Sequence, residues 1–76
     1  MLNRVLDEVG IEADRASRMH APCKSHHEAY AVILEELDEY WDEVKKKTAD
    51  RDPAAMRKEL IQVAATAVRA VNSLCE

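Results

Sequence analysis

The 76-residue sequence contains no phenylalanine, one glycine, two prolines and only two cysteines. Few glycines and prolines mean few turn signals, and the absence of phenylalanine removes a common strand former, so the composition favours helix over sheet. Two cysteines are too few for the dense cross-linking of small secreted domains, so we expect Cys23 and Cys75 to be free thiols. The sequence therefore predicts an all-α protein.

Long apolar runs are also missing. No run approaches the roughly 18 residues needed to cross a bilayer, and residues 1–10 lack the layout of a secretion signal, which predicts a cytoplasmic protein with no membrane partner. Eleven basic residues face fifteen acidic ones, for a formal charge of -4, and the one basic cluster is Lys45–Lys47. This excess of acidic residues argues against binding to the nucleic-acid backbone and favours the binding of cations instead.

Apolar residues recur at steps of three and four along three segments, which is the spacing of one helix face. We expect helices over about residues 2–20, 25–47 and 53–74, within one domain of residues 1–76. The apolar stripes expected to be buried are Leu2, Val5, Leu6, Val9, Ala13, Ala16 and Met19; Tyr30, Ile33, Leu34, Leu37, Trp41 and Val44; and Met56, Leu60, Val63, Ala64, Ala67, Val71 and Leu74.

The length of the chain predicts that it associates with a second subunit. A chain this short buries a small share of its surface, so a partner subunit is expected. The short turn before residue 53 makes the second and third helices an antiparallel hairpin. We expect this hairpin to pair with that of another subunit, forming a helical bundle by homo-oligomerisation, with Trp41 in the interface.

Several residues mark the helix ends. Ser25 to Glu28 matches a capping box, in which both side chains accept from free backbone donors. Asp52 before Pro53 places a capping residue ahead of a proline at the first helical position. Lys45–Lys47 suit the negative C-terminal end of the second helix. The expected four-residue ion pairs are Asp42 with Lys46 and Glu43 with Lys47.

Six of the nine residues from Glu35 to Glu43 are acidic. At 100° per residue, Glu36, Glu39 and Glu43 fall within about 60° of one another, beside the apolar stripe. Taken alone, such a run is most simply a solvated helix face. A carboxylate line at the edge of a groove is also a seat for a divalent cation.

The third helix repeats this design, which favours the cation site. Glu59, Gln62, Thr66 and Arg69 lie within about 80° of one another, again beside the apolar stripe. Antiparallel neighbours can turn two such lines toward one cleft. Carboxylates held close together repel, so they take up protons or bind a hard cation, and Mg²⁺ fits because it also accepts phosphate oxygens as ligands.

The motif E-x-x-E at Glu36 and Glu39, followed after 19 intervening residues by E-x-x-Q at Glu59 and Gln62, resembles the motifs of MazG-like all-α nucleoside triphosphate pyrophosphohydrolases. The resemblance covers roughly residues 26–74. It implies that Glu36, Glu39 and Glu59 bind Mg²⁺ and serve catalysis, with Gln62 assisting at the metal. It also implies cleavage of a nucleotide substrate to monophosphate and pyrophosphate, by a homodimer or homotetramer.

Gln62 departs from the family pattern, which has an aspartate there. A neutral amide contributes an oxygen but no charge, so the metal should bind more weakly. Glu43 and Glu35 are the acidic neighbours able to compensate, whereas Asp38 points to the other side of the helix. Arg69 and Glu43 are expected at the substrate, Arg69 because guanidinium pairs with phosphate. The alternative is an inactive helical interaction module with at most weak metal binding.

Overall fold

The computed structural model describes residues 2–75, which form three α-helices, one short 3₁₀ helix and no strand. Helix α1 spans Leu2–Met19, α2 spans His26–Val44, η1 spans Thr48–Asp50 and α3 spans Pro53–Leu74. The all-α prediction is therefore confirmed. Within these residues, no helix is both long enough and apolar enough to cross a membrane.

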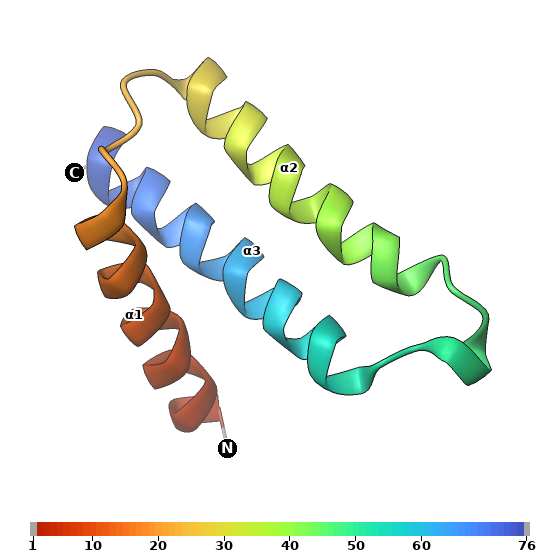
Figure 1. Cartoon of the computed structure of the whole chain (residues 1–76). Helices are drawn as coiled ribbons and strands as arrows, with labels where there is room; N and C mark the ends of the chain where they lie inside the picture. Colours follow the sequence, from red (N-terminus) through yellow and green to blue (C-terminus); the bar gives the residue numbers. More distant parts are fainter. Residues whose placement is uncertain (1, 76) are drawn as a thin grey trace.

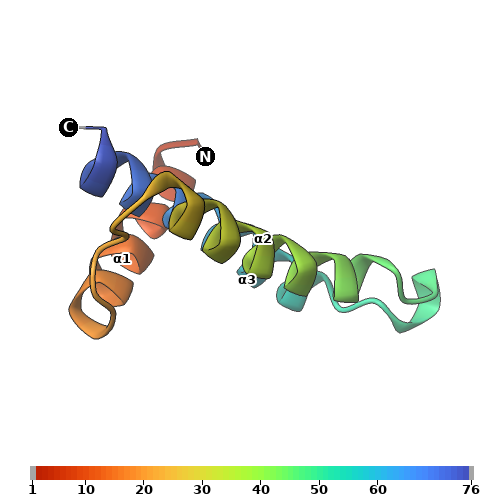
Figure 2. The same ribbon diagram turned by 90° about the horizontal axis from the view of Figure 1, so that it is seen from above.

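Helix α3 is the central element. It packs against α2 on one side and α1 on the other, while α1 and α2 do not pack directly on each other. Figure 1 shows α2 and α3 running antiparallel along their length, with α1 beside α3. The turn that contains η1 lies at the opposite end of the α2–α3 pair from the α1–α2 connection (Figure 2). Polar groups on the neighbouring faces of α2 and α3 are thus held near one another.

Side-chain caps start α2 and α3. Ser25 Oγ accepts a hydrogen bond from the Glu28 backbone N–H at 3.1 Å, which confirms the expected N-cap. The Glu28 carboxylate reaches back one residue further than expected and accepts from the Lys24 N–H at 3.3 Å. Asp52 Oδ1 accepts from the Ala54 N–H at 3.0 Å, so the predicted start of α3 is confirmed as well. Both helix starts are determined by local sequence.

The predicted end of α2 at residue 47 is wrong, because the helix ends at Val44. Arg51 folds back and donates from Nε and Nη2 to the Val44 carbonyl oxygen at 2.9 and 2.7 Å. This side chain satisfies a carbonyl that the helix would otherwise leave free, which stabilises the early end. The lysines consequently sit one position out of the expected register. The observed ion pairs are Asp42 with Lys45 and Glu43 with Lys46.

The core is small and lies mainly between α1 and α3. Val9 and Ala13 of α1 pack against Ala65 of α3, and Ile61 and Ala64 lie against this cluster. Ala65 is the most buried of these side chains, at 2% exposure, although the predicted stripe of α3 omitted it. Small side chains let the two helix backbones approach closely, so the α1–α3 contact depends on alanine rather than on large residues.

The prediction that the apolar stripes are buried is wrong for most large side chains of the single chain. Tyr30 is 70% exposed and Trp41 57% exposed, and no side chain in the described residues is completely buried. The reason is geometric: α1 covers only one side of α3 and never reaches the outer face of α2. The exposed large apolar residues are Leu2, Val5, Leu6, Ile11, Met19, Tyr30, Leu34, Leu37, Trp41, Leu60, Val68 and Val71.

Noncovalent contacts alone hold the described residues together. Cys23 is a half-buried free thiol and Cys75 an exposed one, which confirms the expectation from the sequence. An ion pair links Glu8 of α1 to Arg57 of α3 through both guanidinium Nη atoms. Because this pair is partly exposed, water screens it and packing remains the larger contribution to stability.

The N-cap of α2 gives a direct test of this fold. Replacing Ser25 by alanine should lower the free energy of unfolding by about 1 kcal/mol, because the Glu28 N–H loses its acceptor. Ser73→Ala is the matched control, since its Oγ only donates to a carbonyl within α3 and its loss should change stability by less than about 0.5 kcal/mol. Urea unfolding followed by circular dichroism measures both; equal losses would contradict the capping role.

Candidate metal centre

Three carboxylates from two helices converge beside the α2–α3 contact. Glu36 and Glu39 are three residues apart on α2 and therefore share a face, and Glu59 faces them from α3. One carboxylate oxygen from each lies within 4.8 Å of the other two. We call these three residues the acid triad. Among residues 2–75, no other group of three or more His, Cys, Asp or Glu side chains is placed to hold a metal ion.

Two members of the acid triad are electrostatically strained. Burial raises the pKa of Glu36 above its ordinary value, and the nearby charge of Glu39 raises it further. Burial and then Glu39 likewise raise the pKa of Glu59. Glu36 Oε2 and Glu59 Oε2 are both buried without a hydrogen-bond partner. A buried, unpaired carboxylate oxygen is unfavourable, and either a proton or a cation relieves it.

The donor set fits a hard divalent cation. All three candidate ligands are carboxylate oxygens. Mg²⁺ and Ca²⁺ prefer oxygen ligands, whereas softer metals prefer nitrogen or sulfur. Ligands on an octahedral Mg²⁺ lie about 3 to 4 Å apart, given metal–oxygen distances of about 2.1 Å. The three oxygens lie within 4.8 Å of one another, which is slightly wider than that range, so a bound cation would draw them closer together.

Glu43 and Gln62 extend the site along each helix. Glu43 is close enough to Glu59 for its charge to contribute to the raised pKa of Glu59. Both Glu43 oxygens accept from Lys46 Nζ, at 3.0 and 3.2 Å, so this carboxylate is already neutralised by a neighbour. Gln62 lies one turn after Glu59 on α3 and lines a pocket together with Glu36. Its amide is thus near the acid triad, as the motif spacing predicts.

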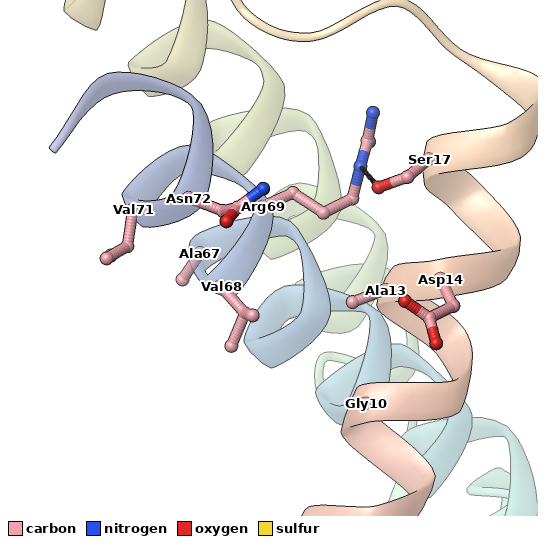
Figure 3. Close-up of a pocket in the computed structure, with 9 residues that line it drawn as sticks. All are labelled: Gly10, Ala13, Asp14, Ser17, Ala67, Val68, Arg69, Val71 and Asn72. Carbon is pink, nitrogen blue, oxygen red and sulfur yellow. Dashed lines mark hydrogen bonds between the residues drawn. The ribbon is translucent and has the colours of Figure 1, made fainter. Parts of the chain in front are cut away.

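Arg69 lies further along α3 and joins it to the end of α1. Its Nε donates to Ser17 Oγ at 3.1 Å, and its Nη2 lies 3.4 Å from the carbonyl oxygens of His20 and Ala21. Figure 3 shows this side chain reaching from α3 to Ser17 across a groove. Arg69 therefore supports the α1–α2 connection in this structure, and Nη1 is its nitrogen without a partner among the described residues.

The groove of Figure 3 is separate from the acid triad. It has a volume of about 540 Å³ and runs between α1 and α3, with small or apolar residues such as Gly10, Ala13 and Val68 along it. Asp14 is the single carboxylate in its lining. This groove therefore offers no cluster of metal ligands.

A second pocket, of about 450 Å³, adjoins the acid triad and is bordered by all three helices. We call it the interhelical pocket. Glu36 and Gln62 lie in its wall, and Arg69 contributes as well. Three further acidic residues line it, namely Glu12, Glu28 and Glu35. Glu28 was expected as a helix cap and Glu35 as a neighbour of the metal site. No local signal places them in one pocket with Glu12, because that depends on how α1 and α2 both pack on α3.

No family model, curated protein or solved structure matches this chain. The chemistry of the site follows from its own donors. Three carboxylates can hold one divalent cation, and the adjoining pocket leaves room for an organic ligand beside that cation. Such an arrangement suits a ligand with an anionic group that binds the cation and a small polar organic group that enters the pocket.

Proposed function

We propose that this protein is a Mg²⁺-dependent nucleotide pyrophosphohydrolase of the MazG-like type, which cleaves a nucleoside triphosphate to monophosphate and pyrophosphate. The observation that supports it is the convergence of Glu36, Glu39 and Glu59 within 4.8 Å, with two buried carboxylate oxygens left unpaired. The raised pKa values of Glu36 and Glu59 indicate that the ionised carboxylates repel one another and that a bound cation would stabilise them.

In this proposal Glu36, Glu39 and Glu59 hold the metal, and the Gln62 amide oxygen assists. Bound Mg²⁺ supplies a Lewis acid that accepts phosphate oxygens and lowers the pKa of water. The three carboxylates would hold that cation beside the interhelical pocket. Glu43 stays paired with Lys46 at the edge of the site, where the lysine charge also favours phosphate.

The proposal includes a second copy of the chain. Large apolar side chains of α2 and α3 are exposed in one chain. Exposed apolar patches of this kind mark interfaces between proteins. Pairing two α2–α3 hairpins would bury them and complete a helical bundle as a homodimer or homotetramer. Trp41, at 57% exposure, is placed in that interface.

Gln62 favours a second candidate function, that of a non-catalytic helical module with weak metal binding. An amide offers no negative charge, so the site carries one carboxylate fewer than the E-x-x-E and E-x-x-D pattern. Three carboxylates are nevertheless sufficient for a Mg²⁺ ion that keeps several waters. Activity of the purified protein separates the two candidates.

The deciding experiment incubates purified protein with ribo- and deoxyribonucleoside triphosphates and Mg²⁺ and measures pyrophosphate. We expect release with at least one nucleotide, and its complete loss with a chelator. Gln62→Asp should lower the Mg²⁺ concentration for half-maximal activity about tenfold, because it adds one charged ligand. Asn72→Asp is the matched control, since it adds the same charge to an exposed part of α3 away from the acid triad.

Each outcome favours one candidate. An inert wild type with an active Gln62→Asp variant identifies the natural protein as the non-catalytic module. If neither protein releases pyrophosphate from any nucleotide, the pyrophosphohydrolase proposal is wrong. An equal effect of Asn72→Asp would assign the gain to general charge rather than to a ligand at position 62.

A further inference from the structure

We propose that the interhelical pocket binds the nucleoside part of the substrate and selects bases that carry an exocyclic amino group, with Glu35 as the specificity-determining residue. This inference rests on the proposed function, because it takes the phosphate chain to lie at the acid triad. It adds the identity of the base, which the acid triad does not determine.

The position of the pocket supports the first part. At about 450 Å³, its volume is in the range of small-molecule sites, about 300 to 1,000 Å³. Glu36 belongs both to the acid triad and to the pocket wall, so the two are contiguous. A nucleotide with its phosphates at the acid triad can therefore place its sugar and base in the pocket.

The charge of the pocket determines which part of a nucleotide enters it. Arg15 and Arg69 are its two arginines, but Arg15 already donates to both Glu12 oxygens, at 2.9 and 2.6 Å. Arg69 likewise donates to Ser17 at 3.1 Å. The carboxylates in the wall outnumber these cations, so phosphate is repelled and hydrogen-bond donors are attracted. The four carboxylates are Glu12, Glu28, Glu35 and Glu36.

Glu35 is the carboxylate available to read the base. Glu12 is paired with Arg15, and Glu28 accepts from the Lys24 N–H at 3.3 Å. Glu35, in contrast, makes no hydrogen bond or ion pair with any described residue, although it lines the pocket. A carboxylate accepts readily from the amino group of cytosine, whereas uracil presents a carbonyl oxygen at that position. An acceptor that faces an acceptor is repelled, so the pocket discriminates between these bases.

The kinetic test compares CTP with UTP, whose bases differ at this amino or carbonyl group. For wild type we expect kcat/KM to favour CTP about tenfold, the value of one charge-assisted hydrogen bond. Glu35→Gln should bring the ratio close to one, because an amide can donate as well as accept. Asp38→Asn is the matched control: it removes one charge from the same helix outside the pocket, and should keep the wild-type ratio.

A binding test does not depend on hydrolysis. CMP and UMP are titrated with Mg²⁺ into wild type and into Ala16→Leu, and the backbone amide shifts of residues in the pocket wall are followed by NMR. Ala16 lines the pocket, so a leucine there should fill it and weaken binding of both monophosphates at least about tenfold. Wild type should bind CMP more tightly than UMP, and Glu35→Gln should remove the difference.

The two tests separate the proposals. If CMP binds in the pocket but no triphosphate is cleaved, the nucleoside pocket stands and the pyrophosphohydrolase does not. If cleavage occurs with equal kcat/KM for CTP and UTP, the selectivity of the pocket is overturned while the hydrolase stands. Binding of CMP that is unchanged in both Ala16→Leu and Glu35→Gln also overturns the pocket assignment.

Discussion

Replacing Glu59 by glutamine is expected to lower Mg²⁺-dependent pyrophosphate release about hundredfold or more, and at the same time to stabilise the metal-free protein at neutral pH. Both effects have one cause. Glu59 is a triad carboxylate whose Oε2 is buried without a partner. Glutamine keeps the shape of the side chain but removes the charge, so it weakens the cation site and relieves the repulsion with Glu39.

The direction of the pH dependence follows from the raised pKa values of Glu36 and Glu59, whose ordinary value is 4.5. A carboxyl with a raised folded-state pKa favours folding below its ordinary pKa, and that contribution is lost as pH rises through the raised value. Metal-free wild type should therefore lose stability as pH rises from about 4.5 toward neutrality. Mg²⁺ should reverse this loss, because it binds the ionised carboxylates.

Two other carboxyl groups act in the opposite sense but in a lower pH window. The hydrogen bond from Arg57 lowers the pKa of Glu8, and that from Arg15 lowers the pKa of Glu12. Their contributions are present above their ordinary pKa and are lost as pH falls through the lowered values. The decline in stability toward neutral pH is therefore assigned to Glu36 and Glu59.

Thermal unfolding over a pH series, with chelator and with millimolar Mg²⁺, measures these effects. At neutral pH, Mg²⁺ should raise the Tm of wild type by about 5 °C or more and leave that of Glu59→Gln nearly unchanged. Asp38→Asn, on the exposed side of α2, should behave as wild type. An equal Mg²⁺ shift in all three proteins would show that the cation does not bind at the acid triad.

Replacing Leu37 by aspartate is expected to abolish association and with it most of the helical structure. Leu37 is 47% exposed in one chain and lies on the α2 face that carries Tyr30, Leu34 and Trp41. Burying such a side chain contributes about 1.5 to 3 kcal/mol, and in a symmetric dimer the substitution occurs twice. A single core in so short a chain rarely supplies more than about 3 to 5 kcal/mol. The buried side chains here are one valine and three alanines, so this core falls well below that bound and the isolated chain should be largely unfolded.

Analytical ultracentrifugation and circular dichroism at matched concentrations test this expectation. Wild type should sediment as a dimer or tetramer with a concentration-dependent Tm, since unfolding is coupled to dissociation. Ile11→Asp is the control, because Ile11 is also exposed, at 68%, but lies on α1 outside this face. A monomeric and fully helical Leu37→Asp variant would show that one chain folds without a partner.

Local sequence signals were sufficient for the starts of α2 and α3. The side-chain oxygens of Ser25 and Asp52 each accept a hydrogen bond from a backbone N–H two or three residues ahead, so the information lies within one turn. The end of α2 could not be inferred in this way, since the Val44 carbonyl is satisfied by Arg51, seven residues later. That contact exists only after the chain turns back on itself.

The candidate site likewise has a part that the local sequence determines and a part that helix packing determines. The three-residue spacing of Glu36 and Glu39 determines that both lie on one face of a helix, whatever the rest of the chain does. Whether Glu59 meets them depends on how α3 is shifted and rotated against α2, which packing decides. The wall of the interhelical pocket depends still more on packing, because Glu12 comes from α1, Glu35 from α2 and Gln62 from α3.

The sequence by itself determined the helical class, the starts of α2 and α3 and the acidic faces, because periodicity and capping act over a few residues. Only the tertiary structure decided the depth of burial. The apolar stripes predicted a larger core, yet Ala65 is the most buried side chain and Trp41 stays exposed. The reason is that burial requires a second surface, and three helices in which α1 and α2 touch only α3 provide too little of it.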